Sequence, residues 1–457
     1  METDPIEYIP LPHETPSPGW IEFCHQIPPT SIPTTFSLSQ LHALTRSISE
    51  TYDDATRWPE RTLLSTLDLT RLALPPGMES FETDVLPILL QAVHLLPTLF
   101  PLPTHNLSTL RLRGSPECTI SLSYKAAGCL LSAAFLGLLD THEWFTLGYI
   151  FTEQPAKALG ILQYLSVFAG RFRDDSLRDA NLTFIRRAIN DLPDLEGEVM
   201  DVSDVPIEVW EKAPIEDGKG MLQADFANMY LGGGVLGGGC VQEEIRIGVT
   251  NPELLLAVLL APAPMGPCEA ILMAGSEMFS SYTGYGHTTA WGGPVVDDAE
   301  IDPETGALDT RVVAFDALMF CFRDPIALQF SQESITRELT KAHAAFYPWP
   351  VGDSASPLPP IATGNWGCGA FGGNKALKAC IQLLACALAG RPMVYCTFGD
   401  VSLSNSLQSL STALSTSPTP IPSSLFSQWL LSAPVPSTPA SPTVIDHLLT
   451  QIDAFHT

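Results

Sequence analysis

Two adjacent glutamates, Glu243 and Glu244, directly follow a run of glycine and are well suited to acid–base chemistry. Six of the eight residues in the run 232–239 are glycine. Glycine lets a backbone come very close to a ligand, and its successive N–H groups can form a concave anion site. Because adjacent carboxylates repel each other, at least one of the two is easier to protonate. This pairing predicts a general acid beside an anionic ligand.

The two glutamates are expected to begin a helix, where adjacent residues point about 100° apart. One carboxyl group can then face a leaving group while the other holds a sugar hydroxyl. A helix N-terminus by itself lowers the pKa of a carboxyl group, so burial and a bound diphosphate must raise it in a general acid. Two solvated acids at a helix start are the alternative interpretation, and a mobile surface loop is the alternative for the glycine run.

A second glycine-rich element, residues 364–373, precedes a helix expected to begin near Lys375. Glycines that lead into a helix N-terminus form an anion site. Two such elements suit a diphosphate that lies between two loops. Aromatic residues flank them and can stack on a base, although core packing is an alternative for each. These residues are Tyr282, Tyr285, Phe371 and Phe398.

The overall charge restricts the partners that this chain can have. It has 457 residues, 50 of them acidic and 23 basic, for a formal net charge of -27. Such a surface repels polyanions, so direct binding to nucleic acid is not expected. A phosphate ligand must be attracted locally, by backbone N–H groups. Neither a signal peptide nor an apolar run of roughly 20 residues is visible, which predicts a soluble nuclear and/or cytoplasmic protein without membrane contact.

Metal-binding patterns are missing from the sequence. There is no C-x-x-C pair, no H-E-x-x-H and no H-x-H, so neither a metal site nor a cofactor is expected.

The order of predicted elements indicates an α/β architecture. Strands are expected at 207–210, 221–226, 269–274, 312–317 and 393–398, and helices at 252–260, 325–346 and 375–388. The preceding part of the chain has mostly helical spacing of apolar residues, at 81–100, 122–139 and 157–168.

Composition divides the chain further. Residues 1–35 are expected to be an irregular arm, and 415–442 a loose Ser/Thr/Pro-rich connection before a terminal helix at 444–455. Five arginines between 171 and 187 alternate with aspartates, which favours a solvated helical face over a patch for an anionic ligand.

Four motifs, in order, make the chain resemble the poly(ADP-ribose) glycohydrolase family of animals and fungi. The family signature is a triple glycine followed by Gln-Glu-Glu, which reads here as 232–234 and 242–244. The other matching segments are 220–228, 282–285, 364–373 and 397–400. The strong resemblance covers roughly 205–400, and a fainter one reaches 126–135.

The resemblance implies a macrodomain-like mixed sheet flanked by helices, with an N-terminal helical accessory domain. The expected division is an arm at 1–35, the accessory domain at 36–200, the catalytic domain at 201–414 and the tail at 415–457. The implied function is hydrolysis of protein-attached poly(ADP-ribose) with release of ADP-ribose. That activity reverses ADP-ribosylation, as in a DNA damage response.

The resemblance also implies the site residues. Glu244 would be the catalytic acid/base, and Glu243 and Asn228 would hold the ribose beside the scissile bond. The other implied ligand positions are Asp225, Gly233, Gly234, Val235, Gly237, Gly238, Gly239, Gln242, Ile215, Glu216, Tyr285, Gly369, Ala370, Phe371, Gly372 and Phe398. Within this set, the glycine loops would cradle the diphosphate and the aromatics would stack on adenine or the second ribose.

Asn374 departs from the family pattern, which often has Asp there. Three other functions fit the glycine loops: a macrodomain that binds ADP-ribose without cleaving it, a hydrolase of mono-ADP-ribosylated protein, and a nucleotide-binding regulator with a degenerate site. The intact glutamate pair favours the polymer-cleaving enzyme.

Overall fold

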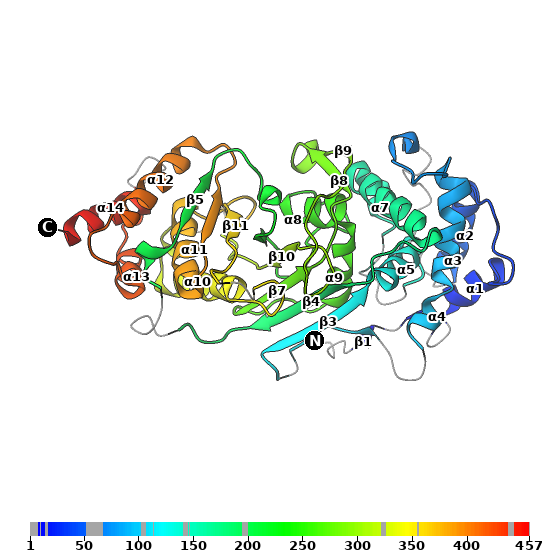
Figure 1. Ribbon diagram of the computed structural model, residues 1–457, viewed down its shortest axis with the longest axis horizontal. Helices are drawn as coiled ribbons and strands as arrows, with labels where there is room; N and C mark the ends of the chain where they lie inside the picture. The colour runs from blue at the N-terminus through cyan, green and yellow to red at the C-terminus, as the bar shows by residue number, and fades with distance from the viewer. Residues whose placement is uncertain are drawn as a thin grey trace.

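One mixed eight-stranded sheet runs through the molecule (Figure 1). The structure is a computed structural model, and it describes residues 8–9, 11–13, 17–51, 67–101, 107–112, 114–139, 145, 147–193, 200–320, 326–353, 356–436 and 443–456. The strand order is β3-β4-β7-β10-β6-β11-β12-β5. The strands are β3 (Glu117–Ser123), β4 (Asn181–Ala188), β5 (Ile207–Trp210), β6 (Leu222–Asp225), β7 (Glu269–Ala274), β10 (Arg311–Ala314), β11 (Ile361–Gly364) and β12 (Met393–Cys396).

The sheet has an antiparallel half and a parallel half. β3, β4, β7 and β10 pair antiparallel, whereas β10, β6, β11, β12 and β5 are all parallel neighbours. Five adjacent parallel strands therefore present their carboxyl ends at one edge, which is where open α/β sheets bind their ligands.

Side chains of β7 show how both faces of the sheet are covered. Ile271 and Met273 belong to one apolar core, and Ala270 and Leu272 to the other. This alternation with a period of two is what a strand buried on both faces requires.

Helices of the N-terminal part gather at one end of Figure 1, and those of the C-terminal part gather at the other. The first group is α1 (Pro18–Gln26), α2 (Leu38–Glu50), α3 (Leu86–Val93), α4 (Leu96–Leu99), α5 (Tyr124–Phe135), α6 (Ile150–Glu153) and α7 (Pro155–Arg173). The second group is α10 (Gln332–Phe346), α11 (Lys375–Ala389), α12 (Val401–Ser415), α13 (Ser423–Leu431) and α14 (Val444–Phe455). Between them lie α8 (Gln242–Ile245), continued by the π-helical turn η6 (Arg246–Thr250), and α9 (Leu255–Leu260). In the part of the chain that the structure describes, no helix is both long and apolar enough to cross a membrane.

The predicted α/β class is confirmed, and several element predictions hold closely. The strands expected at 207–210 and 269–274 and the helix expected at 444–455 have the observed bounds of β5, β7 and α14. The helix predicted at 375–388 is α11.

The region before residue 200, for which a mostly helical pattern is predicted, also contributes two strands to the main sheet. β3 and β4 lie in this range and pair with each other, and β4 also pairs with β7 of the main sheet. The N-terminal helices are consequently joined to the sheet through strands of their own region.

The solvated helical face predicted for the arginines of 171–187 is also wrong for the last two. Arg186 and Arg187 lie on β4 and are only 4% and 8% exposed. They pair with Glu269 and Glu117, at 2.5 and 2.8 Å. Paired in this way, an arginine is tolerated inside a protein.

Two predicted irregular segments contain helices. α1 lies within the arm expected at 1–35, where Ser17 caps it by accepting the Trp20 N–H. α13 lies within the connection expected at 415–442, whose residues 437–442 fall outside the described chain. The start of α1 follows from its residues, because Ser is favoured at the N-cap and Pro at the first helical position.

Candidate active site

A pocket of about 620 Å³ lies at the carboxyl edge of the parallel strands. Its walls include Asn228 after β6, Ala317 after β10, Asn365 after β11, Phe398 after β12 and Lys212 after β5. The volume falls in the range of about 300–1,000 Å³ that small-molecule and cofactor sites occupy. The parallel half of the sheet therefore assembles the pocket from loops that are far apart in the sequence.

Different pairs of backbone N–H groups hold the two glutamates. Glu243 accepts from the N–H groups of Asn228 (2.9 Å) and Gly232 (2.5 Å). Glu244 accepts from those of Gly234 and Val241, both at 2.9 Å. Both acids are buried at the start of α8 rather than solvated, and the divergence of their carboxyl groups stays a prediction.

Glycine is required where the loop contacts the carboxylates. A Cβ atom on Gly233 would lie 2.8 Å from Glu243 Oε2 and 2.9 Å from Glu244 Oε1, and its φ of +49° disfavours other residues as well. A Cβ on Gly239 would lie 2.9 Å from Glu244 Oε1. The run therefore packs closely against the acids, while Gly233, Gly234 and Gly238 stay exposed.

Burial of several acids together shapes the electrostatics of the site. Burial raises the pKa of Glu243 well above its ordinary value, and the Asp225 carboxylate raises it further, against the N–H donors of Asn228 and Gly232. Burial likewise raises the pKa of Asp225 to about 7, which Arg246 opposes. Within the described chain neither oxygen of Asp225 has a hydrogen-bond partner. Burial and mutual repulsion therefore favour the protonated forms of these two acids.

Residues of the second glycine loop, 364–373, line the same pocket as residues of the first loop, and the second loop is fixed from beneath. Trp366 is fully buried, donates its indole N–H to the Phe315 carbonyl (3.0 Å) and lies under Lys378. Asn374 caps α11 by accepting the Leu377 N–H at 3.0 Å. Asn and Asp are both favoured at this capping position, so the departure from the family pattern keeps the cap.

Two aromatic residues of the pocket are poorly explained by core packing. Tyr285 is 57% exposed and Phe398 is 47% exposed, and both line the pocket. Phe398 also has a φ of +54°, which is strained for a residue with a Cβ. Strain of this kind is typical of ligand-binding positions.

Most of the predicted site residues line this pocket. They are Asn228, Gly233, Gly234, Gln242, Glu243, Glu244, Ile215, Glu216, Tyr285, Gly369, Ala370, Phe371 and Phe398.

Six predicted ligand residues are not among the lining residues: Asp225, Val235, Gly237, Gly238, Gly239 and Gly372. Val235 is fully buried and packs toward Gly248, since the loop turns its side chain into the core. Asp225 ends β6 and is 0% exposed, beneath the glutamates. Their roles as ligand contacts stay predictions.

Sequence reasoning missed two cations at the pocket. Lys212 and Lys375 both line it, and Lys375 pairs with Asp400 at 2.7 Å. The position of Lys375 directly after the second glycine loop was a usable signal, whereas Lys212 offered none. The other lining residues include Tyr282, which the sequence predicts as an aromatic that can stack on a base, and residues 365–368 of the second glycine-rich element. The rest are Pro214, Phe226, Ala227, Val241, Gly284 and Ala317.

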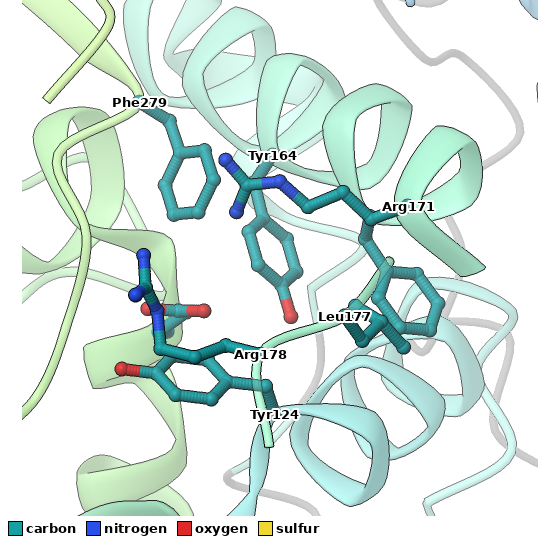
Figure 2. A pocket seen from close by; sticks show the side chains of 8 residues that line it. Tyr124, Tyr164, Arg171, Leu177, Arg178 and Phe279 are labelled. Atoms are coloured by element: carbon teal, nitrogen blue, oxygen red, sulfur yellow. The ribbon is translucent and has the colours of Figure 1, made fainter. Parts of the chain in front are cut away.

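A separate, much smaller cavity lies on the helical side of the sheet (Figure 2). Figure 2 shows Tyr164, Arg171 and Phe279 on one side of this space and Tyr124 and Arg178 on the other. Its volume of about 10 Å³ has room for about one water molecule. This cavity shares no lining residue with the pocket and is too small for an organic ligand.

Comparison with known proteins places this site in a family context. Residues 193–405 match the family model described as "Poly (ADP-ribose) glycohydrolase (PARG), Macro domain fold". The chain is 40% identical over 220 residues to "Poly(ADP-ribose) glycohydrolase 2" of Caenorhabditis elegans, and 33% identical over 308 residues to "Poly(ADP-ribose) glycohydrolase 1" of the same organism. It is 30% identical over 408 residues to "Poly(ADP-ribose) glycohydrolase 1" of Arabidopsis thaliana.

The extent of these matches differs among the relatives. The matches cover 45% and 64% of this chain for the two nematode proteins, but only 43% and 38% of those proteins' own length. For the plant protein they cover 70% of this chain and 73% of the relative.

Replacing Gly233 tests the contact between loop and acids. We expect Gly233→Ala to lower the free energy of unfolding more than Gly390→Ala, a change at another positive-φ glycine (+66°) with open space around it. The shared backbone strain costs about 1–2 kcal/mol, and the collision with two carboxylates adds about 1–3 kcal/mol. Chemical denaturation of both variants measures the difference, and equal losses would contradict the close contact.

Replacing Glu253, which lines the small cavity, tests the raised pKa of its carboxyl group. Burial raises the pKa of Glu253 from 4.5 to about 8 in the fold, so the unfolding free energy falls as pH rises through this window. The glutamine of Glu253→Gln carries no charge at any pH. We therefore expect its unfolding free energy to rise relative to that of the wild type by about 1.4 kcal/mol per pH unit within this window. Denaturation at pH 5, 6.5 and 8 measures this gain, with exposed Glu333→Gln as the control. A constant difference between Glu253→Gln and the wild type would show that Glu253 titrates normally.

Proposed function

Because the chain belongs to the poly(ADP-ribose) glycohydrolase family, we propose that it hydrolyses the ribose–ribose O-glycosidic bonds of poly(ADP-ribose) and releases ADP-ribose. The observation that carries this proposal is the position of Glu244. It lines the pocket, is 7% exposed, and is tied by the Gly234 N–H to a loop suited to bind a diphosphate. A proton donor and an anion site thus share one cavity.

Glu244 is the proposed acid and base of the reaction. Its protonated carboxyl gives its proton to the ribose hydroxyl oxygen as the bond from that oxygen to the anomeric carbon breaks. Positive charge develops at the anomeric carbon of the outgoing ADP-ribose, and a water molecule then attacks this carbon. The Glu244 carboxylate takes a proton from this water and returns to its starting form.

Both oxygens of Glu244 accept backbone N–H groups, so its orientation is fixed before substrate arrives. A carboxyl group that is held in one direction loses little freedom in the transition state. Glu243 and Asn228 are proposed to hold the ribose beside the scissile bond, since both line the pocket next to Glu244. The Asn228 side chain already accepts the Tyr230 N–H at 3.0 Å, which orients its amide.

The remainder of the ADP-ribose unit fits the rest of the pocket. The diphosphate is proposed to lie between the two glycine loops, with Lys212 and Lys375 supplying local positive charge. Adenine would then stack between the exposed rings of Tyr285 and Phe398. Cations at the pocket help because the whole chain is strongly acidic and repels a polyanion at long range.

Glu244→Gln tests the catalytic assignment. We expect the single-turnover rate of cleavage of purified poly(ADP-ribose) to fall by roughly 100-fold to 10,000-fold, because the amide cannot supply the proton. Binding of ADP-ribose should change little, since glutamine has the same shape. Chromatography of released ADP-ribose measures the rate, and Glu333→Gln, an exposed first-turn glutamate of α10, is the matched control. A near-normal rate would remove Glu244 from this role.

The wild type in the same assay separates the rival functions. Tight binding of ADP-ribose without any release from polymer would indicate a binding macrodomain. Release from mono-ADP-ribosylated protein, but not from polymer, would indicate the other hydrolase.

A further inference from the structure

Lys157 is a buried lysine whose ammonium group binds the back of the first glycine loop. It lies in the first turn of α7 and is 0% exposed. Its Nζ donates to the carbonyl oxygens of Val235 (2.7 Å), Gly237 (2.6 Å) and Gly239 (2.6 Å). The Gly234 carbonyl oxygen lies further away, at 3.4 Å. An ammonium group has three N–H donors, so the three shorter contacts match its capacity.

The path of the lysine side chain is fixed by close packing. A Cβ atom on Gly248 of η6 would lie 2.8 Å from Lys157 Cδ, so the stem passes directly over this glycine. One turn further along α7, a Cβ on Gly160 would lie 2.5 Å from the Val249 carbonyl oxygen. α7 and η6 therefore touch backbone to backbone, and the ammonium has a defined position behind the loop.

Peptide geometry links the carbonyls at the back of the loop to the N–H groups at its front. In a trans peptide, the N–H of one residue points opposite to the C=O of the residue before it. Carbonyls of Val235, Gly237 and Gly239 that point at Lys157 thus turn three N–H groups the other way. Those N–H groups belong to Leu236, Gly238 and Cys240.

The same three N–H groups are without an acceptor inside the described chain. Their neighbours differ, because the N–H groups of Val235, Gly237 and Gly239 are used within the loop itself, donating to Gly232 or Gly234. Alternating unused N–H groups with aligned directions make a site for an anion. Gln154, at the N-terminus of α7, adds a fourth hold on the back of the loop by donating to the Gly238 carbonyl at 2.8 Å.

We propose that Lys157 is the positioning residue of the diphosphate site: by collecting three carbonyls at the back of the loop, it directs the N–H groups of Leu236, Gly238 and Cys240 toward the ligand. This inference rests on the proposed function for the nature of the ligand. It also gives the helical part of the chain a role in the site, because α7 lies outside the matched residues 193–405.

The residue type follows from the geometry. A neutral side chain would leave the buried Val235 carbonyl and the partly buried Gly237 and Gly239 carbonyls without this donor, and a buried acceptor without a donor is unfavourable. The planar guanidinium of arginine is larger than an ammonium group and spreads its donors in a fixed fork. The contact with Gly248 leaves little room for it.

Substitution of Lys157 in the full chain tests the proposal. We expect Lys157→Met to weaken ADP-ribose binding roughly tenfold or more, because the N–H groups lose their common orientation. Adenosine has no diphosphate, so its affinity should stay within about twofold of the wild type. In polymer cleavage we expect KM to rise by a larger factor than kcat falls. The reason is that Glu244 is held by the N–H groups of Gly234 and Val241, which do not depend on Lys157. Calorimetry with ADP-ribose and adenosine, and steady-state kinetics, provide the measurements.

Gln163→Met is the matched control. Gln163 is also buried on α7, but it binds the backbone of Ala73 and not the loop. We expect this variant to lose stability while both affinities remain unchanged. Lys157→Arg keeps the charge and should bind ADP-ribose with an affinity between Lys157→Met and the wild type. If Lys157→Met does not fold, Lys157→Arg must still bind ADP-ribose more weakly than the wild type without weakening adenosine.

Failure of this inference can be told apart from failure of the proposed function. A wild type that cleaves polymer, together with a Lys157 variant that binds ADP-ribose as the wild type does, would overturn the positioning role alone. Equal losses for ADP-ribose and adenosine would reduce Lys157 to a purely structural residue. A wild type that neither binds ADP-ribose nor cleaves polymer would overturn the proposed function itself.

Discussion

Contact between two buried carboxylates and a glycine-rich backbone is the constraint on which the site depends. Four N–H groups, from Asn228, Gly232, Gly234 and Val241, hold the carboxylates. Side chains at Gly233 or Gly239 would collide with them. A buried acid needs such donors, since taking its charge out of water is unfavourable. The close approach of the loop is therefore a requirement of burying acids here, as well as a route for a ligand to reach the backbone.

The two halves of the sheet position different parts of the site. In the parallel half, adjacent carboxyl ends bring the loops after β5, β6, β10, β11 and β12 to one edge. The antiparallel half includes β3 and β4, which flank α5 and α7 in the chain. This arrangement sets α7 against η6, directly behind the first glycine loop. The pocket is thus made by one part of the chain and supported by another.

Charge is distributed in a way that agrees with an anionic ligand despite the acidic composition. Several arginines are engaged in buried pairs, such as Arg186 with Glu269 and Arg391 with Asp353, and so stabilise the fold. The cations at the pocket are few: Lys212 and Lys375 line it, and Lys157 lies behind its first loop. Attraction for a diphosphate then comes from nearby N–H groups and these cations, because the field of the whole surface opposes it.

The sequence by itself determined the chemistry of the site and much of the α/β part. Glycine at 233, 234 and 239 and the acids at 243 and 244 are local features, and the divergence of adjacent helical residues follows from helix geometry alone. Short apolar runs likewise predicted strands such as β7 and β12 to within a residue or two.

Tertiary structure decided what depends on partners distant in the sequence. Arg186 and Arg187 can occupy a strand because Glu269 and Glu117 neutralise them, and no local pattern reveals such a pairing. Lys157 interrupts an apolar helical run, and only the packing of α7 on η6 brings its ammonium to the loop carbonyls. The same packing turns Val235 into the core and the Gly237 and Gly239 carbonyls to the back. Local sequence specifies which conformations a segment can adopt, whereas the direction that each group faces is set by contacts formed only when the chain is folded.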